Sequence, residues 1–294
     1  PPVVMGHEAA GRVVAVAEGV TGFAAGDRVT LDSTVFCGEC AHCRRGEINL
    51  CDSRQVLGVS CGDYRRAGAF AEFVAVPARI LHHLPPNLPF EEAAMLEAAA
   101  VAIHAVSLAP LAAGDTALVV GAGTIGLLCL QALRAAGCSR VLIADVDSTR
   151  LQLAASFGGT PVFSADSNTA TQVLAFTNGR GADVVLEAAG LDGTVTDSIE
   201  SVRKGGTVVL VGNITPEVRL PLQKIVTRQI RLQGSCASSG EYPRAIELMA
   251  SGAINVKPFI SAVAPLEEGP LWFERLYARE PNLMKVVLRP GSFS

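Results

Sequence analysis

Four closely spaced cysteines have the spacing of a metal site. They follow the pattern C-x2-C-x2-C-x7-C, at Cys37, Cys40, Cys43 and Cys51. Thiolates this close on one loop can enclose a tetrahedral zinc ion without an open position, which makes the ion structural rather than catalytic. Disulfides are an alternative that a reducing compartment disfavours. An iron–sulfur cluster is another, but ferredoxin-type runs place the fourth cysteine before proline, and Asp52 follows Cys51. We predict a structural zinc site.

A second set of potential metal ligands is spread along the chain. His7 and Glu8 are adjacent in the stretch G-H-E-A-A-G, where they are either metal ligands or a surface pair beside a turn. Glu97 lies in an Ala-rich and Leu-rich segment that predicts a helix starting near Phe90. Because an unpaired buried carboxylate is unfavourable, Glu97 either faces water or meets a cation. These residues alone leave both interpretations open.

A glycine turn follows, with the pattern G-x-G-x-x-G at residues 121–126, between an apolar run and a segment with helical spacing. Gly121 permits a tight turn, Gly123 lets the backbone approach a pyrophosphate, and Gly126 lets the helix lie close to the strand. The free N–H groups where the helix starts, at Thr124 and Ile125, would face the phosphates. An ordinary glycine-rich turn is the alternative, but the flanking strands and helix favour dinucleotide binding.

The choice of dinucleotide depends on an acidic residue. The apolar run after the helix ends on Asp145, about twenty residues beyond the last glycine, where a carboxylate can accept bonds from both ribose hydroxyls. A 2′-phosphate would meet a like charge there, which favours NAD over NADP. Arg150 lies close enough in the sequence to weaken this preference.

Further strands are expected at 183–187, 207–211 and 230–235, as in a doubly wound parallel sheet. Ligands of such sheets bind at the carboxyl ends of the strands. Four more residues are therefore expected to contact the cofactor: Ala188, Val211, Gly212 and Ser235. Before this region, short strands between glycine turns predict a β-rich domain, with a strand pair at 68–77. A strand, a helix and a strand at 259–290 are expected to return to that first domain.

The composition narrows the class of protein. The chain has 294 residues, is 49% hydrophobic and carries a net charge of −4. This length suits two domains, and the absence of a basic run gives no nucleic-acid footprint. The longest apolar region, 93–113, is interrupted by Glu97, His104 and Pro110, so no membrane span is expected. Scattered cysteines in a chain of this size favour a reducing, cytoplasmic setting.

Taken in order, the G-H-E-x-x-G stretch, the four-cysteine loop and the glycine turn resemble the zinc-containing medium-chain alcohol dehydrogenase family. The resemblance covers nearly the whole chain. It implies an α/β protein with a GroES-like catalytic domain at 1–112, a Rossmann domain at 113–252 and a return to the catalytic domain at 253–294, leaving a cofactor cleft between the two domains. It also implies a homodimer or homotetramer.

The family resemblance also sharpens the metal prediction. A histidine matching His7 binds a catalytic zinc in the family, and in the sorbitol-like branch the glutamate matching Glu8 can bind it as well. A glutamate at the position of Glu97 stands at or near that metal. The resemblance therefore implies hydride transfer from a secondary alcohol or polyol to NAD, with zinc as Lewis acid.

One departure from the family bears on activity. The family's first catalytic ligand is a cysteine upstream of the G-H-E motif, and no residue before Pro1 supplies it. Cys61 is not expected to replace it. The sequence thus leaves two alternatives open: a catalytically incomplete, cofactor-binding protein or fragment, and a zinc-free NADPH-dependent quinone or enoyl reductase. The cysteine loop and Glu97 argue against the reductase.

Overall fold

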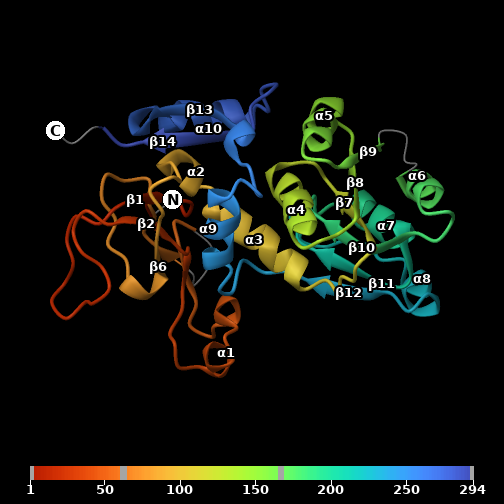
Figure 1. The fold of residues 1–294 in the computed structure, drawn as a ribbon, viewed down its shortest axis with the longest axis horizontal. Coiled ribbons are helices and arrows are strands. Elements are labelled where there is room, and N and C mark those ends of the chain that lie inside the picture. The colour runs from red at the N-terminus through yellow and green to blue at the C-terminus, as the bar shows by residue number, and fades with distance from the viewer. Residues whose placement is uncertain (1–2, 60–64, 165–168, 292–294) are drawn as a thin grey trace. The chain divides into compact units, whose positions relative to one another are not determined.

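The computed structural model describes residues 3–59, 65–164 and 169–291. It contains two compact units (Figure 1), one formed by residues 1–100 and 237–294 and the other by residues 101–236. The limits of these units differ from the expected domain limits. The main reason is helix α9 (Tyr242–Ala250), which belongs to the first unit. There the ring of Tyr242 stacks on His82 with a centroid separation of 4.9 Å.

The second unit is built on one six-stranded sheet with the order β12-β11-β10-β7-β8-β9, in which every neighbouring pair is parallel. Its strands are β7 (Thr116–Val120), β8 (Arg140–Asp145), β9 (Thr160–Phe163), β10 (Ala182–Glu187), β11 (Val202–Leu210) and β12 (Arg231–Gly234). Its helices are α4 (Thr124–Ala135), α5 (Ser148–Ser156), α6 (Thr169–Phe176), α7 (Asp192–Ser201) and α8 (Leu222–Thr227). The strand order reverses between β7 and β10, as in a doubly wound Rossmann sheet.

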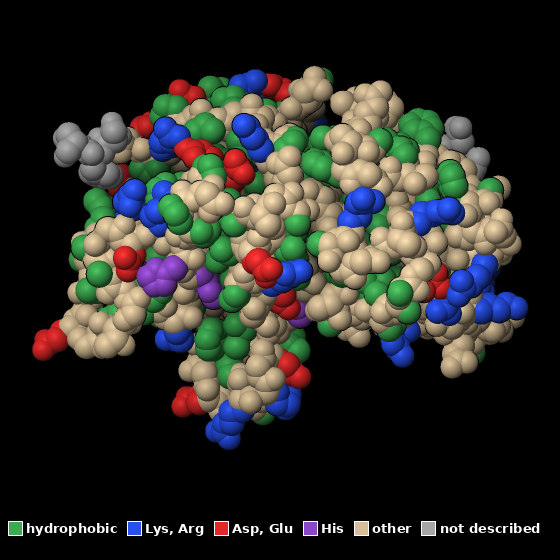
Figure 2. Space-filling model, viewed as in Figure 1, with side chains coloured by type: hydrophobic (Ala, Val, Ile, Leu, Met, Phe, Trp, Pro, Cys, Tyr) green, Lys and Arg blue, Asp and Glu red, His purple; other side chains and the backbone are tan. Residues whose placement is uncertain are grey.

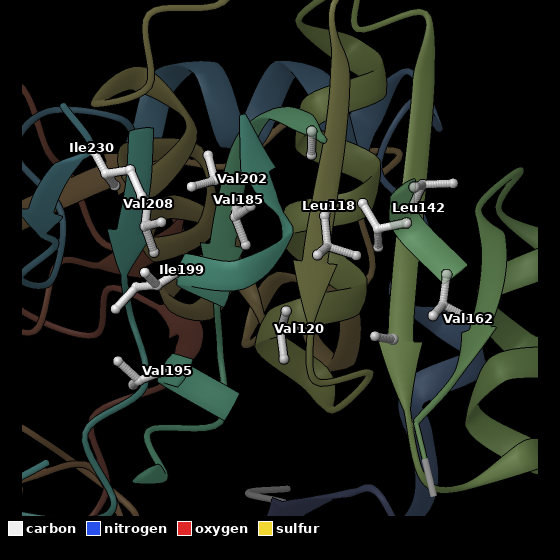
Figure 3. Packing of buried hydrophobic residues seen from close by; sticks show 13 residues of the cluster. Leu118, Val120, Leu142, Val162, Val185, Val195, Ile199, Val202, Val208 and Ile230 are labelled. Carbon is white, nitrogen blue, oxygen red and sulfur yellow. The ribbon is translucent and has the colours of Figure 1, made fainter. Parts of the chain in front are cut away.

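Aliphatic side chains hold this sheet and its helices together. The central strands read as continuous apolar runs, which is typical of parallel strands covered on both faces. Leu118, Leu142 and Val185 are fully buried, and they pack in one cluster with Val195 and Ile199 of α7 (Figure 3). The low aromatic content of the chain, 5%, is therefore no obstacle to a dense core.

The first unit is β-rich and contains three small sheets. Their strands are β1 (Ala10–Arg12), β2 (Arg28–Leu31) and β6 (Leu81–His83); β3 (Thr34–Val35), β4 (Gln55–Leu57) and β5 (Arg65–Arg66); and β13 (Ile260–Pro265) with β14 (Lys285–Arg289). Its helices are α1 (Ala41–Arg44), α2 (Phe90–Ala93), α9 and α10 (Gly269–Tyr277); α3 (Leu96–Ser107) starts in this unit and ends in the second. A GroES-like β domain with a Rossmann domain was the expected fold class, and both parts are present.

Two local predictions were wrong. The segment 68–77 forms no strand pair, because the N–H groups of Gly68, Ala69 and Phe70 donate to the carbonyls of residues 4–6 instead of to a ladder. The helix expected from Phe90 onward is broken at residues 94–95 into α2 and α3. This break places Glu97 in the first turn of α3, where the helix dipole favours a negative charge.

The surface and helix lengths give two further observations. Acidic and basic side chains are interspersed over most of the face shown in Figure 2.

None of the helices in the described part of the chain is both long enough and apolar enough to cross a membrane.

Candidate functional site

His7 is presented by a tight loop in the first unit. Gly6, directly before it, has φ of +98°, and a side chain there would place a Cβ 2.9 Å from the backbone nitrogen of Phe70. The Gly6 carbonyl accepts a hydrogen bond of 2.8 Å from the N–H of Ala69. Glycine is thus required at this position, and the loop holds His7 against the segment 68–70.

The structure brings Glu97 next to His7 and Glu8, although about ninety residues separate it from these two along the chain. One ligand atom from each lies within 4.8 Å of the others, and all three side chains are partly buried. His7 and Glu8 come from the segment before β1, and Glu97 comes from the first turn of α3. The three residues form a candidate metal centre within one compact unit.

Burial and neighbouring charges shift the pKa values of two of the three residues of this centre. Burial, followed by the negative charge of Glu8, raises the pKa of Glu97 to about 8. Burial also lowers the pKa of His7, which keeps the imidazole neutral and able to bind a metal. The ammonium of Lys285, on β14, pairs with the Glu8 carboxylate.

This donor set suits a divalent cation. A neutral imidazole and two carboxylates are ligands that zinc accepts, and three protein ligands leave a position for a substrate. Burial and then the nearby Glu8 carboxylate favour the protonated form of Glu97, and a divalent cation bound by both carboxylates would offset these effects. The residues therefore fit a catalytic zinc ion.

The four cysteines form a second candidate metal centre in the same unit. The sulfurs of Cys37, Cys40, Cys43 and Cys51 lie within 4.8 Å of one another. Backbone N–H groups point at these sulfurs: the N–H of Cys40 lies 3.4 Å from Cys37 Sγ, and that of Cys37 lies 3.3 Å from Cys51 Sγ. Donors of this kind stabilise thiolates.

The pKa values of these thiols also suit a bound cation. Hydrogen bonds from Glu39 and Cys40 lower the pKa of Cys37 to about 6, whereas burial and neighbouring sulfurs raise the pKa of Cys43 to about 12. Four adjacent thiolates cannot all be charged without a cation, so the geometry suits a closed structural zinc site. His42 is not part of this cluster of described ligand atoms, and its Nδ1 lies 2.9 Å from a Glu47 carboxylate oxygen.

The glycine turn in the second unit has the geometry of a phosphate cradle. Gly121 has φ of +98°, and a Cβ on Gly126 would lie 1.7 Å from the Gly121 carbonyl oxygen. Gly123 caps α4, and within the described residues no heavy atom lies within 4 Å of the position its Cβ would occupy. Thr124 and Ile125 begin α4. An anion could approach this backbone closely, as a pyrophosphate does in such turns.

Asp145 ends β8 beside this turn and is 9% exposed. One carboxylate oxygen accepts a 2.6 Å hydrogen bond from the N–H of Ala122, and the other accepts one of 2.9 Å from Asp147. Arg150 pairs with Asp147 at 3.6 Å rather than with Asp145. Asp145 therefore braces the glycine turn, a role that the sequence did not suggest, in addition to presenting a negative charge at the strand end.

The remaining residues expected at the cofactor follow the carboxyl ends of three neighbouring strands of the parallel sheet. Ala188 follows β10, Val211 and Gly212 follow β11, and Ser235 follows β12. The Ser235 hydroxyl oxygen is buried and has no hydrogen-bond partner in the described part of the structure. An orphaned polar atom at the carboxyl edge of a parallel sheet suits a contact with a bound ligand.

Two residues beside the candidate catalytic centre escaped the sequence analysis. Ser33 donates to Glu97 from the turn between β2 and β3, and Lys285 reaches Glu8 from the last strand. Neither belongs to a motif, so only the tertiary structure reveals them. Cys61 lies outside the described residues.

Comparison with known proteins agrees with this arrangement. Residues 1–86 match the family model described as alcohol dehydrogenase GroES-like domain, and residues 124–251 match the model described as zinc-binding dehydrogenase. The first match contains the four cysteines, His7 and Glu8, and the second begins within the glycine turn.

Individual proteins extend the match over most of the chain. A probable D-xylulose reductase A of Aspergillus terreus is 34% identical over 94% of this chain and 79% of its own length. The sorbitol dehydrogenase of Bacillus subtilis is 32% identical over 99% of this chain and 82% of its own. The structure of an alcohol dehydrogenase from Thermus sp. ATN1 superimposes with a TM-score of 0.92 at 33% identity, covering 99% of this chain and 85% of that one. The chain belongs to the zinc-containing medium-chain alcohol dehydrogenase family of oxidoreductases.

Proposed function

We propose that this protein is a zinc-dependent dehydrogenase that transfers a hydride between a secondary alcohol or polyol and NAD. The observation that carries the proposal is the cluster of His7, Glu8 and Glu97, whose ligand atoms lie within 4.8 Å of one another. Relatives named as sorbitol dehydrogenase and xylulose reductase support the polyol class of substrate.

Each residue then has a defined task. His7 and Glu97 hold the catalytic zinc, and Glu8 is a third ligand or steadies the site through Lys285. When bound, zinc acts as a Lewis acid on the substrate hydroxyl, and the nicotinamide ring accepts the hydride. The backbone of residues 121–126 receives the pyrophosphate, and the four cysteines hold a zinc ion that only stabilises their loop.

We propose NAD rather than NADP because Asp145 presents a nearly buried negative charge at the end of β8. Replacing Asp145 with Asn removes the charge and keeps one oxygen that can accept the Ala122 N–H, but it loses the acceptor for the Asp147 N–H. The ratio of kcat/KM with NAD to that with NADP should fall by about 10-fold. Asp27→Asn, the same chemical change in the other unit, should leave the ratio unaltered. An unchanged ratio in Asp145→Asn would mean that this charge does not select the cofactor.

The decisive test of the proposed chemistry combines metal content with activity. Zinc per chain should be about two after dialysis, one ion for each candidate centre. His7→Ala should lower this content by about one and abolish NADH formation from sorbitol, xylitol and 2,3-butanediol, while circular dichroism stays unchanged. NADH formation at the wild-type rate by His7→Ala would remove His7 from the mechanism.

A catalytically incomplete, cofactor-binding protein is the second candidate. The Lys285 ammonium favours it, because it already neutralises Glu8 without a metal. Such a protein would bind NADH and about one zinc ion, in the cysteine centre alone. Metal content therefore separates the two candidates before any substrate is chosen.

We further propose a cytoplasmic homodimer or homotetramer. Family resemblance supports the assembly, and the absence of a disulfide among the described cysteines supports a reducing compartment. Sedimentation equilibrium would distinguish a monomer from either assembly.

A further inference from the structure

Ser33 occupies a rigid turn next to the candidate catalytic centre. It is 4% exposed and lies between the end of β2 and the start of β3. Its carbonyl accepts a 3.0 Å hydrogen bond from the N–H of Leu57, and its two neighbours are also tied down. The N–H of Asp32 donates to Ile80 at 2.7 Å, and the Asp32 carboxylate accepts from the N–H of Thr34 at 2.8 Å. These bonds leave the Ser33 side chain little freedom.

From this turn the Ser33 hydroxyl donates to Oε1 of Glu97 at 3.3 Å. Only one of the two Glu97 carboxylate oxygens receives this bond. A hydrogen bond to one carboxylate oxygen restricts the orientation of the whole group. Ser33 therefore helps to set the direction in which Glu97 presents its remaining lone pairs to a metal.

We propose that Ser33 is a positioning residue for Glu97, orienting its carboxylate for the catalytic metal. The inference rests on the proposed function, because it assumes that Glu97 binds the metal. Residues that orient a metal ligand change metal affinity typically by 10-fold or more when replaced. Ser33 thus acts on metal affinity and coordination geometry through Glu97.

The sharpest test compares Ser33→Thr with Ser33→Val. These side chains have almost the same shape and differ in the hydroxyl, so any effect of crowding is shared. Zinc is removed and replaced by Co²⁺, whose visible d–d bands report the ligand geometry of the histidine–glutamate centre. Thiolate charge-transfer bands report the cysteine centre separately. Metal affinity is measured by competition with a chelator, and thermal melts confirm folding.

We expect Ser33→Val to bind the metal at the histidine–glutamate centre roughly 10-fold more weakly, with altered d–d bands, and Ser33→Thr to bind like the wild type. The thiolate bands should stay constant in both variants.

Equal affinities and identical cobalt spectra for the Thr and Val variants would overturn the role of Ser33 and leave the proposed function intact. A wild-type protein that takes up metal only at the cysteines would overturn both.

Discussion

Replacing two glycines of the same turn with alanine should affect different properties: Gly126→Ala should reduce stability, and Gly123→Ala should reduce NADH affinity. At Gly126 a Cβ would lie 1.7 Å from the carbonyl oxygen of Gly121, which is backbone and cannot move aside. Gly126→Ala should therefore lower the free energy of unfolding by about 1–3 kcal/mol, the usual penalty of overpacking, or prevent folding.

At Gly123 the expected result is different. Its φ of −72° is accessible to alanine, and no described heavy atom lies within 4 Å of the position of the new Cβ. The smaller entropy of the unfolded chain and the weaker helix cap should offset each other to within about 1 kcal/mol. The methyl group would nevertheless stand where the pyrophosphate approaches, so NADH affinity should fall by at least about 10-fold.

Urea unfolding measures the first effect and titration of NADH fluorescence measures the second. The combination expected is a Gly123→Ala protein that is as stable as the wild type but binds NADH poorly. Wild-type affinity in Gly123→Ala would show that close approach of the backbone is not what this glycine provides. A fully stable Gly126→Ala protein would contradict the packing of α4 against the turn.

Three further changes test other parts of the structure. Arg203→Gln should lower the free energy of unfolding by about 1–3 kcal/mol at neutral pH, because Arg203 pairs at 2.7 Å with Asp183, which is 4% exposed. Burial alone would raise the pKa of Asp183, but hydrogen bonds and nearby arginines lower it below its value in the unfolded chain. The stabilisation by Asp183 is therefore present above the pKa of the unfolded state and is lost as the pH falls, so the urea midpoints of the wild type and Arg203→Gln should converge in acid. Cys51→Ser should reduce zinc by about one per chain in elemental analysis, with NADH affinity unaltered. Lys285→Met should strengthen zinc binding at the histidine–glutamate centre by about 10-fold in chelator competition, because a cation paired with Glu8 is removed; weaker binding would mean that Lys285 supports the site.

Local patterns were sufficient for the features whose chemistry lies within a short stretch. The cysteine spacing predicted a cluster that the structure shows, with the four sulfurs within 4.8 Å. The glycine turn predicted a strand and a helix, observed as β7 and α4, because its spacing encodes a turn and a close packing contact that need no distant partner.

Prediction failed where backbone partners come from elsewhere in the chain. The alternating residues 68–77 satisfy a strand pattern, yet the first N–H groups of this segment donate to the loop that carries His7. A periodicity of two describes side chains only, and it does not indicate which carbonyls are within reach. The break in the helix before Glu97 was also not evident from the sequence.

The sequence by itself determined the two domain types, the cysteine centre and the glycine turn, because each depends on residues close together along the chain. His7, Glu8 and Glu97 could be proposed as ligands only through family resemblance, since from the residues alone each was as compatible with a surface position. Their meeting within 4.8 Å, with Ser33 on Glu97 and Lys285 on Glu8, was decided by the tertiary structure. The physical reason is that this site is assembled from the segment before β1, the turn after β2, the first turn of α3 and strand β14. It depends on how these parts pack, and packing joins residues whose separation in sequence carries no periodic signal.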